Sequence, residues 1–317
     1  MADNVAGLQP VDLAQDALHH GRPLLHVVDG TRLFAEPLLP LPRLVIAGGG
    51  HVAVALAPIA RAAGFAVTVL EDRPEYAQPE RFPGAAVLCL EPSTGIAQLK
   101  PDTGTFVVIV TRTHETDLMA CQASLQWPTA YVGMIGSRRK VAAVKQVLVE
   151  LSDVRAERLQ QLHAPVGLDI GAETPAEIAV SIVAELIAMR RGGTGLPLSA
   201  APHSTHRTEG IACGDADTID VWLALAQALR EDASCALTTI VQVKGSTPRT
   251  SGASMLVYAD GRCVGSIGGG KREAELQTIA RSAIVTGLPI LCRLAYTEEQ
   301  DALCGGVAEV LIEPISL

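Results

Sequence analysis

The segment from Leu44 to Asp72 constrains the fold of this chain more than any other part of the sequence. A short apolar run, Leu-Val-Ile-Ala, ends in three consecutive glycines, and His51 then opens a stretch of small residues with helical spacing. A second apolar run follows and closes with Glu71 and Asp72. A strand, a glycine turn, a helix, a strand and a terminal acid, in this order, predict a βαβ unit of the dinucleotide-binding kind.

Each part of this unit suits a nucleotide. The glycines let the backbone approach a pyrophosphate, and the helix that follows offers free N–H groups and the positive end of its dipole. An acid at the end of the second strand can accept hydrogen bonds from ribose hydroxyls. The candidate nucleotide-binding residues are therefore Gly48, Gly50, His51, Glu71 and Asp72.

Strand and helix patterns continue to alternate after this unit. Apolar runs at 85–89, 105–110 and 130–134 predict further strands of a parallel sheet. Thr174-Pro-Ala-Glu predicts the capped start of a long helix. In a parallel sheet the loops that follow the strands meet at one edge, so we expect several of them to line one cleft. These loops are 48–51, 71–73, 111–117 and 136–139.

The composition of the chain changes along its length in a way that predicts two domains of the α/β class. The expected segments are an N-terminal helix and hairpin (1–40), a Rossmann-like domain with a parallel sheet (41–193), a linker rich in small and polar residues (194–216), and a smaller α/β domain with a mixed sheet (217–317). The spacing Ala-x-x-Ala-x-x-x-Gly-x-Pro-x-Leu occurs at 14–25 and again at 280–291. We interpret residues 11–38 as a shortened relic of the end of the C-terminal domain.

The overall composition excludes several classes of partner. A net charge of −9 and an aromatic content of 3% argue against nucleic acid, which needs basic surfaces and rings for base stacking. No apolar run reaches the ~18 residues needed to span a bilayer, and the first residues lack the pattern of a signal peptide. The seven cysteines are scattered and form no C-x-x-C pair. We expect a cytoplasmic protein without a disulfide framework or a structural zinc site.

Two loops in the C-terminal domain carry groups suited to a phosphate. Three glycines open a predicted helix, where exposed N–H groups and the helix dipole favour an anion. A second loop offers two hydroxyls and a guanidinium. The residues are Gly268, Gly269 and Gly270 in the first loop and Ser246, Thr247 and Arg249 in the second. If the loops are adjacent, they form a phosphate pocket; the alternative is a glycine turn needed for tight packing.

Cys304 lies between a turn and two glycines. The glycines favour an accessible, backbone-rich environment, which suits a thiolate ligand for a soft metal. The alternative is a small buried apolar residue, which is the commonest role of a free cysteine.

His114 and Asp117 are three residues apart at the end of a predicted strand. They form a candidate acid–base pair or part of a metal site. The alternative is that His114 caps the helix that follows.

These motifs together resemble the XdhC/CoxI family, the accessory factors of xanthine dehydrogenase and related molybdenum hydroxylases. In the Rossmann part the resemblance rests on Gly48-Gly-Gly-His-Val-Ala, Leu70-Glu-Asp-Arg-Pro-Glu, Thr111-Arg-Thr-His-Glu-Thr-Asp, Gly133-Met-Ile-Gly-Ser-Arg-Arg-Lys and the segment 167–182. In the other domain it rests on Gly245-Ser-Thr-Pro-Arg, Gly265-Ser-Ile-Gly-Gly-Gly and Cys304-Gly-Gly.

The resemblance implies a chaperone rather than a turnover enzyme. Such proteins bind the molybdenum cofactor (molybdopterin), are thought to protect it during sulfuration, and deliver it to the apo-hydroxylase. The implied partners are a xanthine dehydrogenase-like apo-enzyme, a cysteine desulfurase and a second copy of the chain. Cys304 becomes a candidate molybdenum ligand, and the Rossmann domain can hold NAD(P) or another nucleotide.

The sequence departs from the family pattern in two ways. The usual order puts the CoxI-like domain before the Rossmann domain, and here the order is reversed. Lys271 follows the three glycines where some relatives carry a cysteine, which leaves Cys304 as the single thiol candidate. An alternative function is an NAD(P)-dependent oxidoreductase acting on a small substrate, with His114 and Asp117 as its acid–base residues.

Overall fold

The computed structural model describes residues 9–150, 154–201, 210–296 and 306–315. The chain divides into two compact units. The Rossmann unit comprises residues 41–213, and the second unit combines residues 1–40 with 214–317. The first division matches the predicted boundary, and the second lies inside the segment that we expected to be a linker. None of the described helices is long and apolar enough to cross a membrane.

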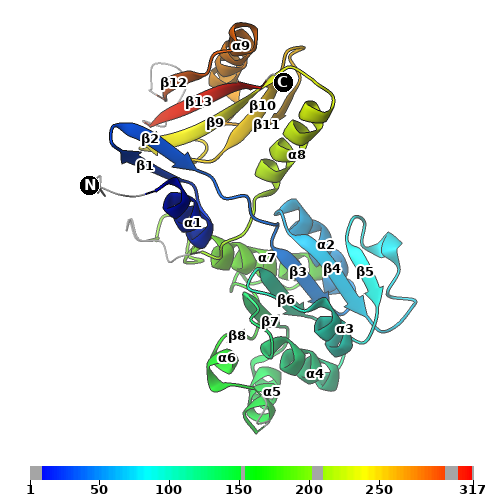
Figure 1. The fold of residues 1–317 in the computed structure, drawn as a ribbon. Coiled ribbons are helices and arrows are strands. Elements are labelled where there is room, and N and C mark those ends of the chain that lie inside the picture. Colours follow the sequence, from blue (N-terminus) through cyan, green and yellow to red (C-terminus); the bar gives the residue numbers. More distant parts are fainter. Residues whose placement is uncertain (1–8, 151–153, 202–209, 297–305, 316–317) are drawn as a thin grey trace. The chain divides into compact units, whose positions relative to one another are not determined.

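The Rossmann unit is built on a six-stranded parallel sheet, as predicted (Figure 1). Its strands are β3 (Arg43–Ala47), β4 (Ala66–Glu71), β5 (Ala86–Cys89), β6 (Thr105–Ile109), β7 (Tyr131–Met134) and β8 (Leu162–His163). They lie in the order β5-β4-β3-β6-β7-β8. The chain leaves β3 toward one edge and returns through β6 toward the other. The carboxyl ends of β3 and β6 therefore form the switch point at which ligands bind in such folds.

Helices cover both faces of this sheet, which explains why its central strands are apolar throughout. The helices are α2 (His51–Ala62), α3 (Pro92–Leu99), α4 (His114–Leu125), α5 (Arg138–Glu150), α6 (Ala156–Gln160) and α7 (Pro175–Arg191). One core joins the sheet to α2 and α7, and a second core joins the opposite face to α3, α4 and α5. All five residues of β6 are buried between these two cores.

The starts of two helices follow from local hydrogen bonds. Thr174 and Glu177 form the predicted capping box of α7, with Pro175 at its first position. The helix α4 begins at His114, four residues earlier than the sequence suggested, because the Thr113 side chain accepts a hydrogen bond from the backbone N–H of Thr116.

The second unit contains a five-stranded sheet in the order β11-β10-β9-β13-β12. Its strands are β9 (Cys235–Lys244), β10 (Ser254–Tyr258), β11 (Cys263–Gly265), β12 (Ile290–Ala295) and β13 (Val307–Ile315). Every neighbouring pair is antiparallel, so the expectation of a mixed sheet is wrong. The reason is the connection from β11 to β12, which crosses the whole sheet through one helix and reaches the opposite edge with no parallel neighbour.

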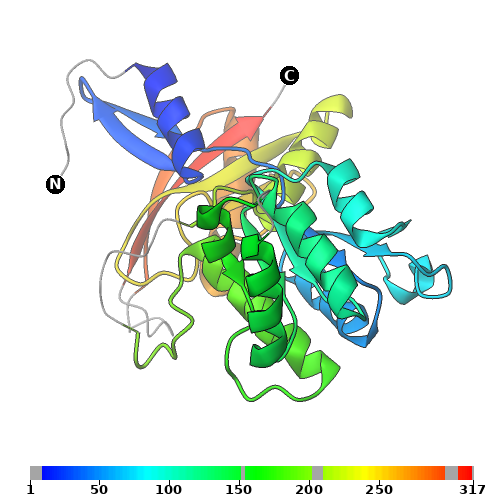
Figure 2. The same ribbon diagram turned by 90° about the horizontal axis from the view of Figure 1, so that it is seen from below.

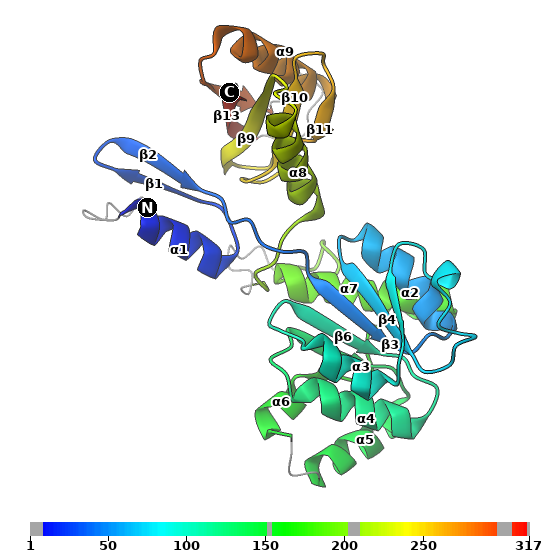
Figure 3. The ribbon, with the colours of Figure 1, turned by 45° about the vertical axis from the view of Figure 1, so that its right-hand side comes forward.

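One helix covers each face of this sheet (Figure 3). The helix α8 (Ala216–Arg230) packs its apolar side on Cys235, Leu237 and Leu256. The crossing helix α9 (Gly270–Thr286) packs on the other face, where side chains of β9, β10 and β13 alternate with the first set. Both predicted hairpin strands around Asp260-Gly261 are present.

The same unit includes a small helix and hairpin from the start of the chain. The helix α1 (Pro10–His20) lies beside an antiparallel pair, β1 (Leu24–Val28) and β2 (Thr31–Ala35) (Figure 2). Gly21 ends α1 and Gly287 ends α9, each in the left-handed conformation. The repeated sequence pattern therefore corresponds to a repeated local structure, a helix that ends in glycine and leads into an antiparallel strand pair.

Glu36, directly after β2, makes the stability of this unit depend on pH. Burial raises the pKa of Glu36 to about 7, so the folded state keeps a proton that the unfolded chain releases above its ordinary pKa of 4.5. Stability should therefore be full below about pH 4.5 and fall as pH rises to about 7, by on the order of 2 kcal/mol. Glu36→Gln should remove this loss in urea unfolding at pH 5 and pH 8.

The exposed residue Glu231 provides a matched control for this measurement. Glu231→Gln should retain the pH dependence of the wild type. An equal loss of stability between pH 5 and pH 8 in Glu36→Gln and in the wild type would contradict the assignment to Glu36.

Candidate functional site

A crevice lies at the carboxyl ends of β3, β4 and β6 in the Rossmann unit. Its volume is about 370 Å³. The lining residues come from three of the four loops predicted to converge there, with further residues from other segments. They are Gly48, Gly50, His51, Val52, Glu71, Asp72, Arg73, Pro92, Val110, Thr111, Arg112, Thr116, Ile135 and Pro175. The predicted convergence is confirmed for loops 48–51, 71–73 and 111–117, whereas loop 136–139 does not line the crevice.

The glycine turn after β3 forms the floor of this crevice. Gly48 has φ +114°, and a side chain there would place its Cβ 2.6 Å from the carbonyl oxygen of Val110. The turn therefore packs directly against the end of β6. A Cβ at Gly50 would meet nothing within 4 Å, so this residue faces open space at the start of α2.

Glu71 is buried beneath the turn, and its carboxylate is fully engaged. It is 3% exposed and accepts a hydrogen bond of 2.7 Å from the backbone N–H of Gly49. The backbone N–H and the guanidinium of Arg73 also donate to it, at 2.8 to 3.2 Å. Glu71 therefore holds the glycine turn in place, and the neighbouring acid is the one that faces the crevice.

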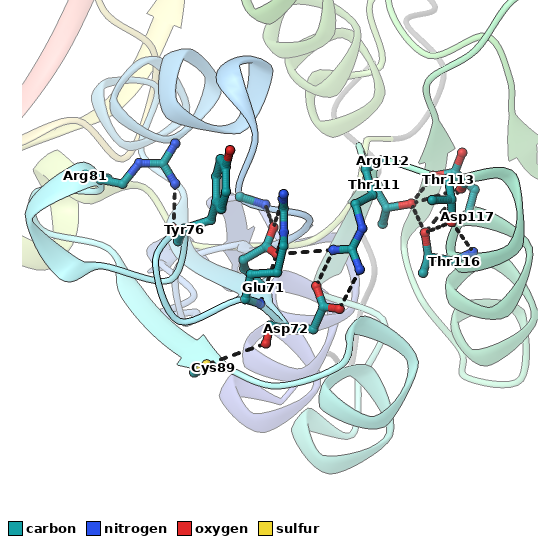
Figure 4. Close-up of polar contacts among 12 residues, drawn as sticks. Glu71, Asp72, Tyr76, Arg81, Cys89, Thr111, Arg112, Thr113, Thr116 and Asp117 are labelled. Atoms are coloured by element: carbon teal, nitrogen blue, oxygen red, sulfur yellow. Dashed lines mark hydrogen bonds and ion pairs between the residues drawn. The ribbon is translucent and has the colours of Figure 1, made fainter.

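Asp72 forms a two-point ion pair with Arg112, which follows β6 (Figure 4). The two N–O distances are 2.7 and 3.0 Å. The hydrogen bonds from Arg112 outweigh the effect of burial and lower the pKa of Asp72 to about 2. Asp72 is therefore ionised at any pH at which the protein is folded.

Asp117 is buried at the rim of the same region and is held by other residues of the unit. Its carboxylate accepts a hydrogen bond of 2.5 Å from Thr111 and pairs with Lys140. His114 is exposed at the first position of α4, and the structure of the described residues records no hydrogen bond or ion pair between it and Asp117. The proposed acid–base pair is thus not brought together. No group of three or more potential metal ligands occurs in the described part of the chain either.

The two phosphate-binding loops predicted in the second unit are adjacent. A Cβ at Gly268 would lie 3.0 Å from Pro248, and one at Gly306 would meet the carbonyl of Ser246. Gly306 ends the loop that contains Cys304, which itself lies outside the described residues. The turn 246–249, the glycine turn and the end of the cysteine loop therefore meet at one end of the antiparallel sheet.

An internal carboxylate occupies the glycine turn of the second unit. Glu273 accepts hydrogen bonds from Ser266 Oγ at 2.6 Å and from the backbone N–H groups of Ile267 and Gly269 at 3.1 and 2.9 Å. Burial alone would raise the pKa of Glu273, but these hydrogen bonds lower it below the ordinary value. Arg249 is also engaged, in a 2.9 Å ion pair with Asp217.

Two family models match this chain. The model of the XdhC Rossmann domain matches residues 44–186, and the model of the XdhC and CoxI family matches residues 228–295. Together they cover both units. The chain belongs to the XdhC and CoxI family. In this member the Rossmann match precedes the CoxI match, which is the order read from the sequence.

Several known proteins are similar to this XdhC and CoxI family chain. One is the uncharacterized protein YqeB of Escherichia coli K12, with 39% identity over 158 residues, covering 49% of this chain and 28% of the relative. Another is named as a probable subunit of the xanthine dehydrogenase of Bacillus subtilis 168, with 32% identity over 187 residues, covering 59% and 53%. A crystal structure described as a xanthine dehydrogenase from Bacillus halodurans shares 28% identity, with a TM-score of 0.42 over 50% of this chain and 46% of that one. The chain thus spans about half or less of the length of these relatives.

Sequence reasoning assigned no role to Arg73, Arg112 or Glu273, although each carries a central contact. Arg73 directly follows the acid pair, and Arg112 directly follows a strand end, so their positions in the converging loops were a usable signal. Glu273 gave no such signal, because its hydrogen bonds depend on the left-handed conformations of the glycines before it.

Proposed function

We propose that this chain is an accessory factor in the maturation of a xanthine dehydrogenase-type molybdenum hydroxylase. In this role it binds the molybdenum cofactor, supports its sulfuration and inserts it into the apo-enzyme. Family membership and the similarity to a relative named as a probable xanthine dehydrogenase subunit support the class of partner. The single observation that carries the cargo assignment is the adjacency of the turn 246–249, the glycine turn 268–270 and Gly306.

The groups at this place fit the cofactor as cargo. The cofactor carries a phosphate and a metal that prefers sulfur ligands. The backbone N–H groups of the glycine turn already bind one oxyanion, the carboxylate of Glu273, so the turn is suited to a phosphate oxygen. The residues that would hold the phosphate are Ser246, Thr247, Arg249, Gly268, Gly269 and Gly270. Cys304, two residues before Gly306 in the sequence, would supply the soft ligand.

The further partners belong to the same proposal. The sulfur that replaces a terminal oxo group must come from a donor, for which a cysteine desulfurase is the suitable class. The recipient is the apo-hydroxylase, and the active form of the factor is a homodimer. Chemical crosslinking with an apo-hydroxylase and size-exclusion chromatography test these partners directly.

The cargo assignment is tested with protein made in a host that synthesises the cofactor. The wild type should retain pterin, seen by fluorescence after oxidation, together with molybdenum. Cys304→Ala should lose at least about tenfold of the bound molybdenum, because a soft metal held by carboxylates and backbone alone is weakly bound. Cys89→Ala is the matched control, because Cys89 is an exposed free cysteine in the other unit. Equal molybdenum in Cys304→Ala and Cys89→Ala would remove Cys304 from the site, and wild type without pterin would refute the cargo assignment.

A further inference from the structure

The ion pair between Arg112 and Asp72 joins two loops on opposite sides of β3. Arg112 follows β6 and Asp72 follows β4, and these strands flank β3 in the sheet. The glycine turn after β3 therefore lies between them, and both side chains line the crevice above it (Figure 4). A ligand that enters the crevice must meet this guanidinium.

The start of α2 provides a second source of positive potential in the same crevice. No side chain caps this helix, and its first turn contains no acid. Uncapped N–H groups at a helix start attract phosphate oxygens. The open space above Gly50 leaves room for them. A helix start on one side and a guanidinium on the other suit a diphosphate, which carries charge along its length.

The carboxylates of the crevice indicate what lies next to that diphosphate. Each oxygen of Asp72 accepts one hydrogen bond from Arg112 and retains a second lone pair. Asp72 is about one-third exposed and ionised, so it can also accept hydrogen bonds from the two hydroxyls of a ribose. Glu71 cannot serve in this way, because Gly49 and Arg73 already engage both of its oxygens.

The charges next to Asp72 disfavour a phosphate on the ribose. Arg73 pairs with Glu71 and stacks on the ring of Tyr76 at 3.7 Å, and Arg112 pairs with Asp72. The two guanidinium groups are thus matched by two carboxylates. A 2′-phosphate would have to lie against Asp72 without a free cation to offset the repulsion.

We propose that this crevice binds a ribonucleotide that carries a diphosphate and a free 2′,3′-diol, with Asp72 as the acceptor for the diol and Arg112 as the clamp on the diphosphate. NAD⁺, ADP and ADP-ribose share this chemistry, whereas NADP⁺ lacks it. The crevice volume of about 370 Å³ is within the range of small-molecule sites. The proposal is independent of the cargo site, because all of its residues belong to the Rossmann unit.

Isothermal titration calorimetry of the full chain with ADP, NAD⁺, NADP⁺ and AMP tests the proposal. ADP and NAD⁺ should bind, and NADP⁺ should bind at least about tenfold more weakly than NAD⁺, as expected for one unfavourable charge contact. AMP should bind more weakly than ADP, because it lacks the second phosphate. If ADP binds and NAD⁺ does not, the ligand is a free nucleotide rather than a dinucleotide.

Three variants separate the two roles. Asp72→Asn should weaken NAD⁺ by about tenfold and narrow its advantage over NADP⁺, because it removes the charge that faces the diol. Arg112→Gln should weaken ADP and NAD⁺ by about tenfold or more, and Arg112→Lys should restore part of this loss. Asp260→Asn is the matched control, because Asp260 forms a similar exposed pair with Arg262 in the other unit.

The proposal is overturned if the folded wild type binds neither ADP nor NAD⁺ at millimolar concentration, or if NADP⁺ binds as tightly as NAD⁺. It is also overturned if Asp72→Asn behaves like Asp260→Asn. Circular dichroism of each variant confirms that the fold is intact. Pterin content is measured on the same samples, so failure of nucleotide binding is distinguished from failure of the cargo assignment.

Discussion

Gly48→Ala should destabilise the Rossmann unit by about 3 kcal/mol or more. The residue has φ +114°, and its new Cβ would be 2.6 Å from the Val110 carbonyl oxygen, which belongs to backbone and cannot move aside. Backbone strain and overpacking each cost about 1–3 kcal/mol. Urea unfolding followed by circular dichroism measures the loss.

Gly50→Ala is the matched control two residues along the same turn. A Cβ there meets nothing within 4 Å, and Gly50 has an ordinary φ of −72°. Its unfolding midpoint should stay within the error of the wild type, although nucleotide binding is expected to weaken. Equal stability of Gly48→Ala and Gly50→Ala would contradict the close packing between the turn and β6.

Glu185→Ala should also cost about 3 kcal/mol, because it breaks a network that ties α7 to β7 and β8. The Glu185 carboxylate accepts hydrogen bonds from Tyr131 Oη at 2.8 Å and from the Gly167 N–H at 2.6 Å, and it bonds His163 Nδ1 at 2.8 Å. Burial alone would raise the pKa of Glu185, but these bonds lower it. The network therefore stabilises the fold fully above the ordinary pKa of 4.5 and is lost as pH falls below it.

Thermal and urea unfolding of two variants test this network. Tyr131→Phe removes one of the three partners and should cost about 1 kcal/mol. Glu185→Ala should cost clearly more, because Tyr131 and Gly167 then lose their shared acceptor. The interpretation would be wrong if the two variants were equally stable, or if the acid sensitivity of the wild type persisted unchanged in Glu185→Ala.

Much of the Rossmann unit could be predicted because its signals are local. The apolar strand β3, the glycine turn and Thr174 with Glu177 each report their structure within a few residues. The helix α3 was missed although Pro92 stands at its first position and Glu91 caps it. The strand β8 has only two residues and leaves no periodicity to detect.

The polar contacts of the crevice were less accessible, because they join residues far apart in the sequence. Arg112 and Asp72 lie on different loops, and the sequence does not indicate which cation meets which acid. Asp117 was expected to work with His114, but its partners are Thr111 and Lys140. The antiparallel character of the second sheet depends on which edge the helix α9 reaches, and no local pattern encodes that.

The pairing of β9 has a consequence for the order in which the protein folds during synthesis. The strand β9 lies at the centre of its sheet, yet one of its two neighbours is β13, so that Cys235 pairs with Ile315. Contacts this distant in sequence form slowly, because a long loop must close before they are rewarded. The sheet of the second unit therefore stays incomplete until β13 has left the ribosome, whereas the Rossmann unit can already be folded by then.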